Sequence, residues 1–279
     1  MPDDKPLVIR SNAKVNLSLR ITGVLPNGYH TISSLFQEID LHDELHFRPA
    51  DRFQLTSSNP NLPIDSTNLC CKAYEAMRPF AKVGHEWQIH LIKNIPTGAG
   101  LGGGSSNAAT VLKFLNRHWE ANLPEPALAR IAVRLGSDVP FYLNGKTQIG
   151  NGVGEILTPV KLPESFVVLL ICPPISISTA WAYGEFGLVN CKKEYKFGSL
   201  FDEKRIFWTL FENQFESVVF PSYPEIGAIR EEMKREPVLY VGLSGSGSTV
   251  FGIFRNETEA ATAQKRFRNY PTFLTLPIF

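Results

Sequence analysis

The residues best suited to chemistry form a glycine-rich tract from Pro96 to Ser106, with the sequence PTGAGLGGGSS. Because glycine lacks a Cβ atom, an anion can approach the backbone amides closely, and a helix that follows adds positive potential at its N-terminus. Ser105 and Ser106 can cap that helix, donate to a phosphate or help to hold a metal ion through a hydroxyl. The tract therefore predicts a phosphate-binding loop; a flexible loop followed by a serine-capped helix is the alternative.

Three known phosphate-loop types do not account for this tract. The residue directly before Ser105 is glycine and not lysine, so the Walker pattern GxxxxGK[ST] is absent. Gly98, Gly100 and Gly103 match GxGxxG, but a dinucleotide site requires a second parallel strand soon after the helix. The sequence instead predicts another helix, which stops at Gly136. The HRD and DFG motifs of protein kinases are also absent.

Strands and helices in mixed order must position the tract. Alternating apolar and polar residues predict a half-buried strand over 15–22 and, after a turn at 26–28, a returning strand over 29–39. Further strands are predicted at 45–47, 53–56, 87–92, 167–171, 238–243, 249–254 and 273–276, and helices at 68–81 and 257–267. A helix is also predicted directly after the glycine-rich tract, and a second one after it that stops at Gly136; their apolar stripes are Val111, Leu112, Leu115 and Trp119, and Leu128, Ile131, Ala132 and Leu135. This order indicates an α+β fold with antiparallel-rich sheets. We expect an N-terminal nucleotide-binding domain over 1–157 and a C-terminal domain over 158–279.

Composition and charge exclude several classes of protein. Of the 279 residues, 43% are hydrophobic and 20% are charged, which is typical of a folded globular protein. The net charge of +1 provides no global field to hold nucleic acid or an anionic membrane. No apolar run approaches the roughly 18 residues of a membrane span, and the first residues do not resemble a secretory signal. The cysteines lack CxxC spacing and are predicted to be buried apolar residues in a reduced cytoplasm: Cys70, Cys71, Cys172 and Cys191.

Several blocks of sequence, in order, resemble the GHMP kinases, which include galactokinase, homoserine kinase and mevalonate kinase. They are Ala13-Lys14-Val15-Asn16-Leu17, the tract from Pro96 to Ala108, and Ser244-Gly245-Ser246-Gly247-Ser248. The blocks at 27–31, 35–37, 101–109, 135–141 and 152–155 are most similar to the members that phosphorylate a CDP-linked methylerythritol in the non-mevalonate isoprenoid pathway. The resemblance implies that ATP, delivered with Mg²⁺, phosphorylates the 2-hydroxyl of the methylerythritol unit in a cleft between two domains. It also implies a cytoplasmic monomer or homodimer with no nucleic-acid or membrane partner.

The resemblance further implies roles for single residues. Lys14 and Asp138 are expected to be catalytic, with Asp138 as general base or hydroxyl orienter and Lys14 beside it at the acceptor hydroxyl. Asp138 follows the helix stop at Gly136 and precedes Pro140, a place suited to starting a short helix whose N-terminus would favour the ionised carboxylate. Substrate contacts are expected from Asn16, Tyr29, His30, Thr179 and Tyr183. Nucleotide contacts are expected from Asn68, Lys93, Pro96, Gly98, Gly100, Leu101, Gly102, Gly103, Gly104, Ser105 and Ser106. No acidic metal ligand is identified, so Mg²⁺ is expected to be held chiefly by ATP and by Ser105 or Ser106.

Some of these assignments have alternatives. In the kinases resembled, the tyrosine corresponding to Tyr29 stacks on cytosine and the histidine corresponding to His30 hydrogen-bonds it; a second stacking aromatic, commonly phenylalanine, is here Tyr183 or Trp181. Lys14 could instead be a solvated lysine on an edge strand. The segment 244–248 could instead be a simple hairpin turn with no role in binding. The alternative functions are another GHMP kinase, of the homoserine or mevalonate type, and an inactive nucleotide-binding protein of the same fold. An RNA-binding role is a third alternative, which the net charge of +1 disfavours.

Overall fold

The computed structural model describes residues 5–186 and 199–279, and the chain divides into two compact units. Unit 1 comprises Met1–Ala13, His42–Thr97 and Gly102–Asn144, and unit 2 comprises Lys14–Leu41, Gly98–Leu101 and Gly145–Phe279. The units are discontinuous in sequence because the two long strands at the start of the chain pass from one unit into the other. A single domain boundary between residues 157 and 158 therefore stays a prediction.

The order of elements is that of the expected α+β class. The strands are β1 (Leu7–Val24), β2 (His30–Ala50), β3 (Gln54–Ser57), β4 (Glu86–Ile92), β5 (Thr147–Asn151), β6 (Ile156–Pro159), β7 (Val167–Ile171), β8 (Tyr240–Leu243), β9 (Val250–Phe254) and β10 (Thr272–Thr275). The helices are α1 (Leu69–Met77), α2 (Gly103–His118), α3 (Glu125–Leu135), α4 (Phe141–Asn144), α5 (Thr179–Phe186), α6 (Glu216–Ser222), α7 (Pro224–Met233) and α8 (Glu257–Gln264). Single 3₁₀ turns lie at Arg78–Phe80, Trp208–Leu210 and Lys265–Phe267. None of the helices in these described residues has the length and apolar character of a membrane span.

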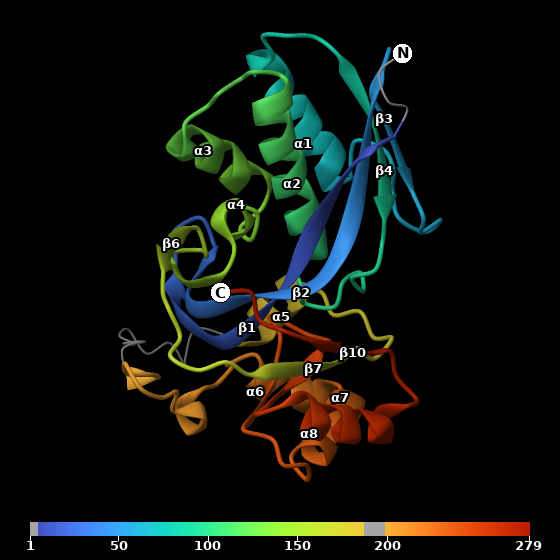
Figure 1. Cartoon of the computed structure of the whole chain (residues 1–279). Coiled ribbons are helices and arrows are strands. Elements are labelled where there is room, and N and C mark those ends of the chain that lie inside the picture. The colour runs from blue at the N-terminus through green and yellow to red at the C-terminus, as the bar shows by residue number, and fades with distance from the viewer. Residues whose placement is uncertain (1–4, 187–198) are drawn as a thin grey trace. The chain divides into compact units, whose positions relative to one another are not determined.

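Unit 1 packs a layer of helices on part of a mixed sheet. Within this part, β4 pairs antiparallel with the second half of β2 and in parallel with β3. Helices α1, α2 and α3 pack together beside the sheet (Figure 1). Phe114 of α2 stacks on Phe47 of β2 with a centroid separation of 3.7 Å and meets Trp87 of β4 edge-on. These buried rings fix α2, and with it the start of that helix, against the sheet.

Unit 2 contains an antiparallel sheet in the order β10-β7-β9-β8. Every residue of β7 and β9 is buried, which is why both read as continuous apolar runs. Helix α7 packs on β8 and β9, and α8 packs on β7, β9 and β10. The first half of β2 also belongs to unit 2 and pairs antiparallel with β5, which in turn pairs with β6.

The structure corrects three expectations about the elements. The strand over 15–22 is not half-buried, because all residues from 13 to 19 in β1 are buried and its polar face is satisfied by hydrogen bonds. The strands expected at 29–39 and 45–47 are one continuous strand, β2. Helices α5 to α7 lie in a stretch for which the sequence predicted no helix. Helix α6 contains Pro221, and α7 begins at Pro224, where proline is tolerated because it stands at the first helical position.

The cysteines that the structure describes are buried, as expected. Burial raises the pKa of the Cys70 thiol to about 12 and that of the Cys172 thiol to about 11, so neither is a reactive thiolate at neutral pH. Cys71 is also buried. Cys191 lies outside the described residues.

Candidate nucleotide and substrate site

The glycine-rich tract ends in the first turn of α2. The helix begins at Gly103, and its N-cap is Gly102, which has φ 68° and ψ 14° and makes no side-chain capping bond. Ser105 and Ser106 lie inside the first turn, where the Ser106 amide donates to the Gly102 carbonyl at 3.0 Å. The serines therefore do not cap α2. The first amides of the helix have no helical acceptors, and together with the helix dipole they suit an anion.

The earlier part of the tract, residues 98–101, is supported by the turn between β8 and β9. Ser244 Oγ donates to the Gly100 carbonyl at 2.9 Å, and the Thr249 amide donates to the Ala99 carbonyl at 3.3 Å. Gly100 has φ +78°, and a Cβ atom there would lie 2.1 Å from the Ser244 carbonyl oxygen. The segment 244–248 is thus both a hairpin turn and the surface on which the tract packs.

Lys14 and Asn16 lie beside this same part of the tract. The Lys14 amide donates to the Leu101 carbonyl at 3.0 Å. Lys14 Nζ donates to Asn16 Oδ1 at 2.5 Å, and Asn16 Nδ2 donates to Ser34 Oγ at 2.8 Å. Lys14 is 3% exposed and Asn16 is 2% exposed. Lys14 is therefore a buried, positioned ammonium and not a solvated edge lysine.

The rings expected to recognise a base also meet in unit 2. His30 and Tyr183 stack with a centroid separation of 4.6 Å and an interplanar angle of 20°. Phe215 packs edge-on against Tyr183 at 4.9 Å and is buried, so it supports the pair from within the protein. Trp181 instead packs edge-on against Tyr223. The structure thus brings Tyr183, not Trp181, to His30.

Two other predicted substrate residues differ in their surroundings. The hydroxyls of Thr179 and Ser246 are hydrogen-bonded at 2.9 Å, which attaches the start of α5 to the β8–β9 turn. Tyr29 is 65% exposed in the turn that precedes β2, where its amide donates to Asn27 Oδ1 at 3.1 Å. Its ring is therefore accessible to a ligand.

Asn213 is a buried residue of this site that sequence reasoning missed. Its Nδ2 donates to the carbonyls of Leu243 and Gly245 at 2.6 Å and 2.8 Å, and its Oδ1 accepts from the Phe215 amide at 3.0 Å. Asn213 therefore holds both the turn that supports the tract and the residue that supports Tyr183. The sequence offers no motif for it, since it is a single asparagine in an irregular segment.

Asp138 lies in unit 1, in the turn between α3 and α4. The Val139 amide donates to the Gly136 carbonyl at 3.2 Å, and α4 begins at Phe141, so the expected short helix does follow Asp138. The Asp138 side chain is half-buried. Because Asp138 belongs to unit 1 and Lys14 to unit 2, their meeting at one hydroxyl stays a prediction, as does the cleft between domains.

The predicted nucleotide residues Asn68 and Lys93 have structural partners in unit 1. Asn68 is the N-cap of α1: its Oδ1 accepts from the Cys70 amide at 2.8 Å and its Nδ2 donates to the Pro63 carbonyl at 2.6 Å. The Lys93 side chain is 5% exposed, and its Nζ donates to Asp43 Oδ2 at 2.6 Å. The contacts of both residues with a nucleotide stay predictions.

Comparisons with known proteins identify the family of this chain. The model of the GHMP kinases N terminal domain matches residues 68–146, and that of the GHMP kinases C terminal domain matches residues 199–271. A curated 4-diphosphocytidyl-2-C-methyl-D-erythritol kinase of Chloroherpeton thalassium is 39% identical and covers 96% of each chain. This chain belongs to the GHMP kinase family. The family expected from the sequence is therefore confirmed, and with it an ATP-dependent class of kinases.

Other relatives refine the comparison within the GHMP kinases. A protein of Chlorobium phaeobacteroides that bears the same name is 40% identical and covers 97% of each chain. A crystal structure of a 4-(cytidine 5'-diphospho)-2C-methyl-D-erythritol kinase matches with a TM-score of 0.85 and 29% identity over 98% of this chain and 100% of that chain. The mevalonate kinase of Methanococcus jannaschii matches with a TM-score of 0.74 at 14% identity over 100% of both chains, which shows a shared fold alone.

Proposed function

We propose that this GHMP kinase transfers the terminal phosphoryl group of ATP to the 2-hydroxyl of 4-diphosphocytidyl-2-C-methyl-D-erythritol. The observation that carries the proposal is the stacked pair of His30 and Tyr183, 4.6 Å apart, in the same unit as Lys14 and Asn16. An aromatic platform of this kind suits a nucleobase. Homoserine and mevalonate have no base, so a kinase for either has no use for it. The curated relatives at 39–40% identity bear the name of this activity.

The triphosphate of ATP is proposed to bind at the start of α2. Phosphoryl transfer depends mainly on positioning and on charge stabilisation, because the transferred group carries its negative charge on its oxygens. The uncapped amides at Gly103 and Gly104 and the helix dipole supply donors for those oxygens. Supports for the proposal are the left-handed conformation of Gly102 and the close packing of Gly100 on the Ser244 carbonyl.

Mg²⁺ is proposed to arrive with ATP. Within residues 5–186 and 199–279, no group of three or more His, Cys, Asp or Glu side chains is arranged to hold a metal ion. Mg²⁺ usually keeps several waters and is bound by substrate phosphates with only one or two protein ligands. Ser105 is the better candidate ligand, since it is half-exposed, whereas Ser106 is 2% exposed and its Oγ accepts from Ser11 Oγ at 2.7 Å. The bound ion would offset the charge that develops between the phosphates.

The acceptor hydroxyl is proposed to bind near Lys14 and Asn16. Asp138 accepts the proton of the 2-hydroxyl as the oxygen forms its bond to the terminal phosphorus of ATP, and the bond from that phosphorus to the bridging oxygen of ADP breaks. The Lys14 ammonium favours the developing negative charge on the attacking oxygen. Asn16 Oδ1 accepts a hydrogen bond from Lys14 Nζ, so the Asn16 side chain fixes the position of the Lys14 ammonium. A cytoplasmic location and a monomeric or dimeric state remain predictions.

A coupled assay of ADP release tests the proposal. We expect turnover with the CDP-linked alcohol, and none with homoserine or mevalonate at equal concentration. Turnover of homoserine or mevalonate without turnover of the CDP-linked alcohol would replace the proposed substrate. ATP binding without turnover of any of these alcohols would instead favour an inactive nucleotide-binding protein.

A further inference from the structure

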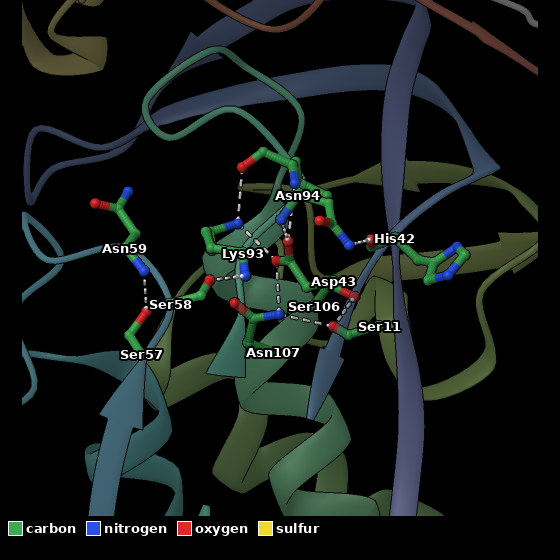
Figure 2. A network of polar contacts seen from close by, with 11 residues as sticks. Ser11, His42, Asp43, Ser57, Ser58, Asn59, Lys93, Asn94, Ser106 and Asn107 are labelled. Carbon is green, nitrogen blue, oxygen red and sulfur yellow. Dashed lines mark hydrogen bonds and ion pairs between the residues drawn. The ribbon is translucent and has the colours of Figure 1, made fainter. Parts of the chain in front are cut away.

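A buried carboxylate holds the two ends of the glycine-rich tract. Asp43 of β2 is 0% exposed, and both of its oxygens accept hydrogen bonds (Figure 2). Oδ1 accepts from the backbone amides of Asn94 and Ile95, each at 2.8 Å. Oδ2 accepts from Lys93 Nζ at 2.6 Å and from Asn107 Nδ2 at 2.9 Å. Asp43 was not among the residues that the sequence indicated.

The first three of these donors come from the segment that enters the tract. Residues 93–95 connect the end of β4 with Pro96, and other bonds in unit 1 hold the same segment. The Lys93 amide donates to Ser58 Oγ at 2.9 Å, and Asn94 Nδ2 donates to the His42 carbonyl at 3.0 Å. Asp43 thus lies at the centre of a network that fixes the backbone just before the tract.

The fourth donor comes from the segment that leaves the tract. Asn107 lies in the second turn of α2, and its Nδ2 also donates to Ser11 Oγ at 3.0 Å. Ser11 Oγ in turn donates to Ser106 Oγ at 2.7 Å (Figure 2). One carboxylate therefore ties the entry of the tract to the helix that follows it.

Charge gives a second reason for Asp43 at this place. Lys93 Nζ lies 3.0 Å from the position that a Cβ atom of Gly103 would take, in the first turn of α2. A cation at the N-terminus of a helix is unfavourable, and a buried cation needs a counter-charge. Asp43 supplies that negative charge, so the Lys93 ammonium can lie beside the first turn of α2 without opposing the helix dipole.

We propose that Asp43 is a positioning residue for ATP. By holding 93–95 and Asn107 together, it closes the tract between them and sets the amides at the start of α2 before the nucleotide arrives. A loop that is already ordered loses less conformational freedom on binding, which improves affinity. The inference rests on the proposed function, since it assumes that the tract binds ATP.

The test uses Asp43→Asn, Lys93→Met and the double variant in the full chain. Asp43→Asn keeps one oxygen for the backbone amides, but its new NH₂ group faces the donors of Lys93 and Asn107, and Lys93 loses its counter-charge. The double variant removes the buried ammonium and so recovers most of the melting temperature. It does not restore the acceptor for Asn107. We therefore expect ATP to bind about tenfold more weakly to Asp43→Asn than to the unaltered protein, and about tenfold more weakly to the double variant than to Lys93→Met, by calorimetry without an acceptor alcohol.

Two further variants separate positioning from general loss of stability. Asn107→Ala breaks only the exit side of the network and leaves the ion pair in place, so it should weaken ATP binding with a small change in melting temperature. Tyr74→Phe is the matched control, because the buried Tyr74 hydroxyl donates to Glu86 and accepts from the Trp87 amide away from the network. It should lower the melting temperature and leave ATP binding unchanged. In turnover assays, KM for ATP should rise in the Asp43 variants while KM for the CDP-linked alcohol stays within about twofold.

The outcomes distinguish this inference from the proposed function. ATP binding by the double variant within twofold of Lys93→Met, together with binding by Asn107→Ala within twofold of the unaltered protein, would overturn the positioning role of Asp43 and leave the proposed function standing. An equal rise of KM for ATP and for the alcohol would also overturn it, since that pattern indicates general damage. Failure of the unaltered protein to bind ATP would refute the proposed function and this inference together.

Discussion

Replacement of Gly100 by alanine, with Gly98→Ala as the matched control, tests how the tract is supported. Both glycines have positive φ, +78° and +69°, so alanine pays a similar conformational cost of about 1–2 kcal/mol at either position. The space around them differs. A Cβ atom at Gly98 would have Ser176 Oγ, at 3.5 Å, as its nearest neighbour, whereas one at Gly100 would lie 2.1 Å from the Ser244 carbonyl oxygen.

The magnitude at Gly100 follows from that overlap. Its nearest neighbours are backbone atoms of the β8–β9 turn, which cannot rotate away, so the tract has to move off the turn. Overpacking of this kind costs about 1–3 kcal/mol, and the lost bond from Ser244 Oγ to the Gly100 carbonyl costs about 1 kcal/mol. With the conformational cost, Gly100→Ala should destabilise the protein by about 3–6 kcal/mol, against about 1–2 kcal/mol for Gly98→Ala.

Urea unfolding and ATP calorimetry on both variants measure these costs. We expect Gly100→Ala to have the lower unfolding midpoint and the weaker ATP binding, because the start of α2 follows directly on the displaced backbone. If the two variants lose the same stability and the same affinity, the packing of the tract on the β8–β9 turn does not govern either property, and the reasoning fails.

Three other substitutions, and Trp181→Ala as a control, test single residues of the site. Asp138→Asn should lower kcat by about 10²-fold or more while ATP binds normally; a kcat within tenfold of the parent would remove Asp138 as the base. Tyr183→Ala should raise KM for the CDP-linked alcohol by an amount equivalent to about 1–3 kcal/mol, whereas Trp181→Ala should not, and the reverse result would exchange their roles. Asn213→Leu leaves two buried carbonyls without this donor, so at about 1–3 kcal/mol each it should cost about 2–6 kcal/mol in urea unfolding and raise KM for both substrates; a change in stability alone would limit Asn213 to the fold.

The conformation of the glycine-rich tract was predictable because the chemistry expected of it constrains residue type. An amide-lined loop that turns into a helix needs left-handed residues and close backbone approach, and both requirements select glycine. Gly100 and Gly102 meet them in the structure, with positive φ at both and a close contact at Gly100. For the same reason the start of α2 was expected within a few residues of its observed place.

The burial of β1 was not predictable from its pattern. Val15 and Leu17 alternate with Lys14 and Asn16, which is typical of a strand with one face in water. In the structure, the polar face is covered as well, and its side chains are satisfied by partners such as Ser34 of β2 and, for Ser18, the backbone of residue 212. An alternating sequence shows that one face of a strand is polar, but that face can point into a site as well as into solvent.

Asp43 and Asn213 were missed for a reason that follows from their contacts. Asp43 accepts from the amides of Asn94 and Ile95, and Asn213 donates to two carbonyls of the β8–β9 turn. Every residue type carries these main-chain groups, proline's missing amide aside, so such contacts impose no side-chain pattern on the partner segment. Yet a site that binds anions through backbone amides depends on whatever holds that backbone in place. Buried polar side chains whose partners are main-chain atoms flanking a glycine-rich loop are therefore where positioning residues should be sought in GHMP kinases.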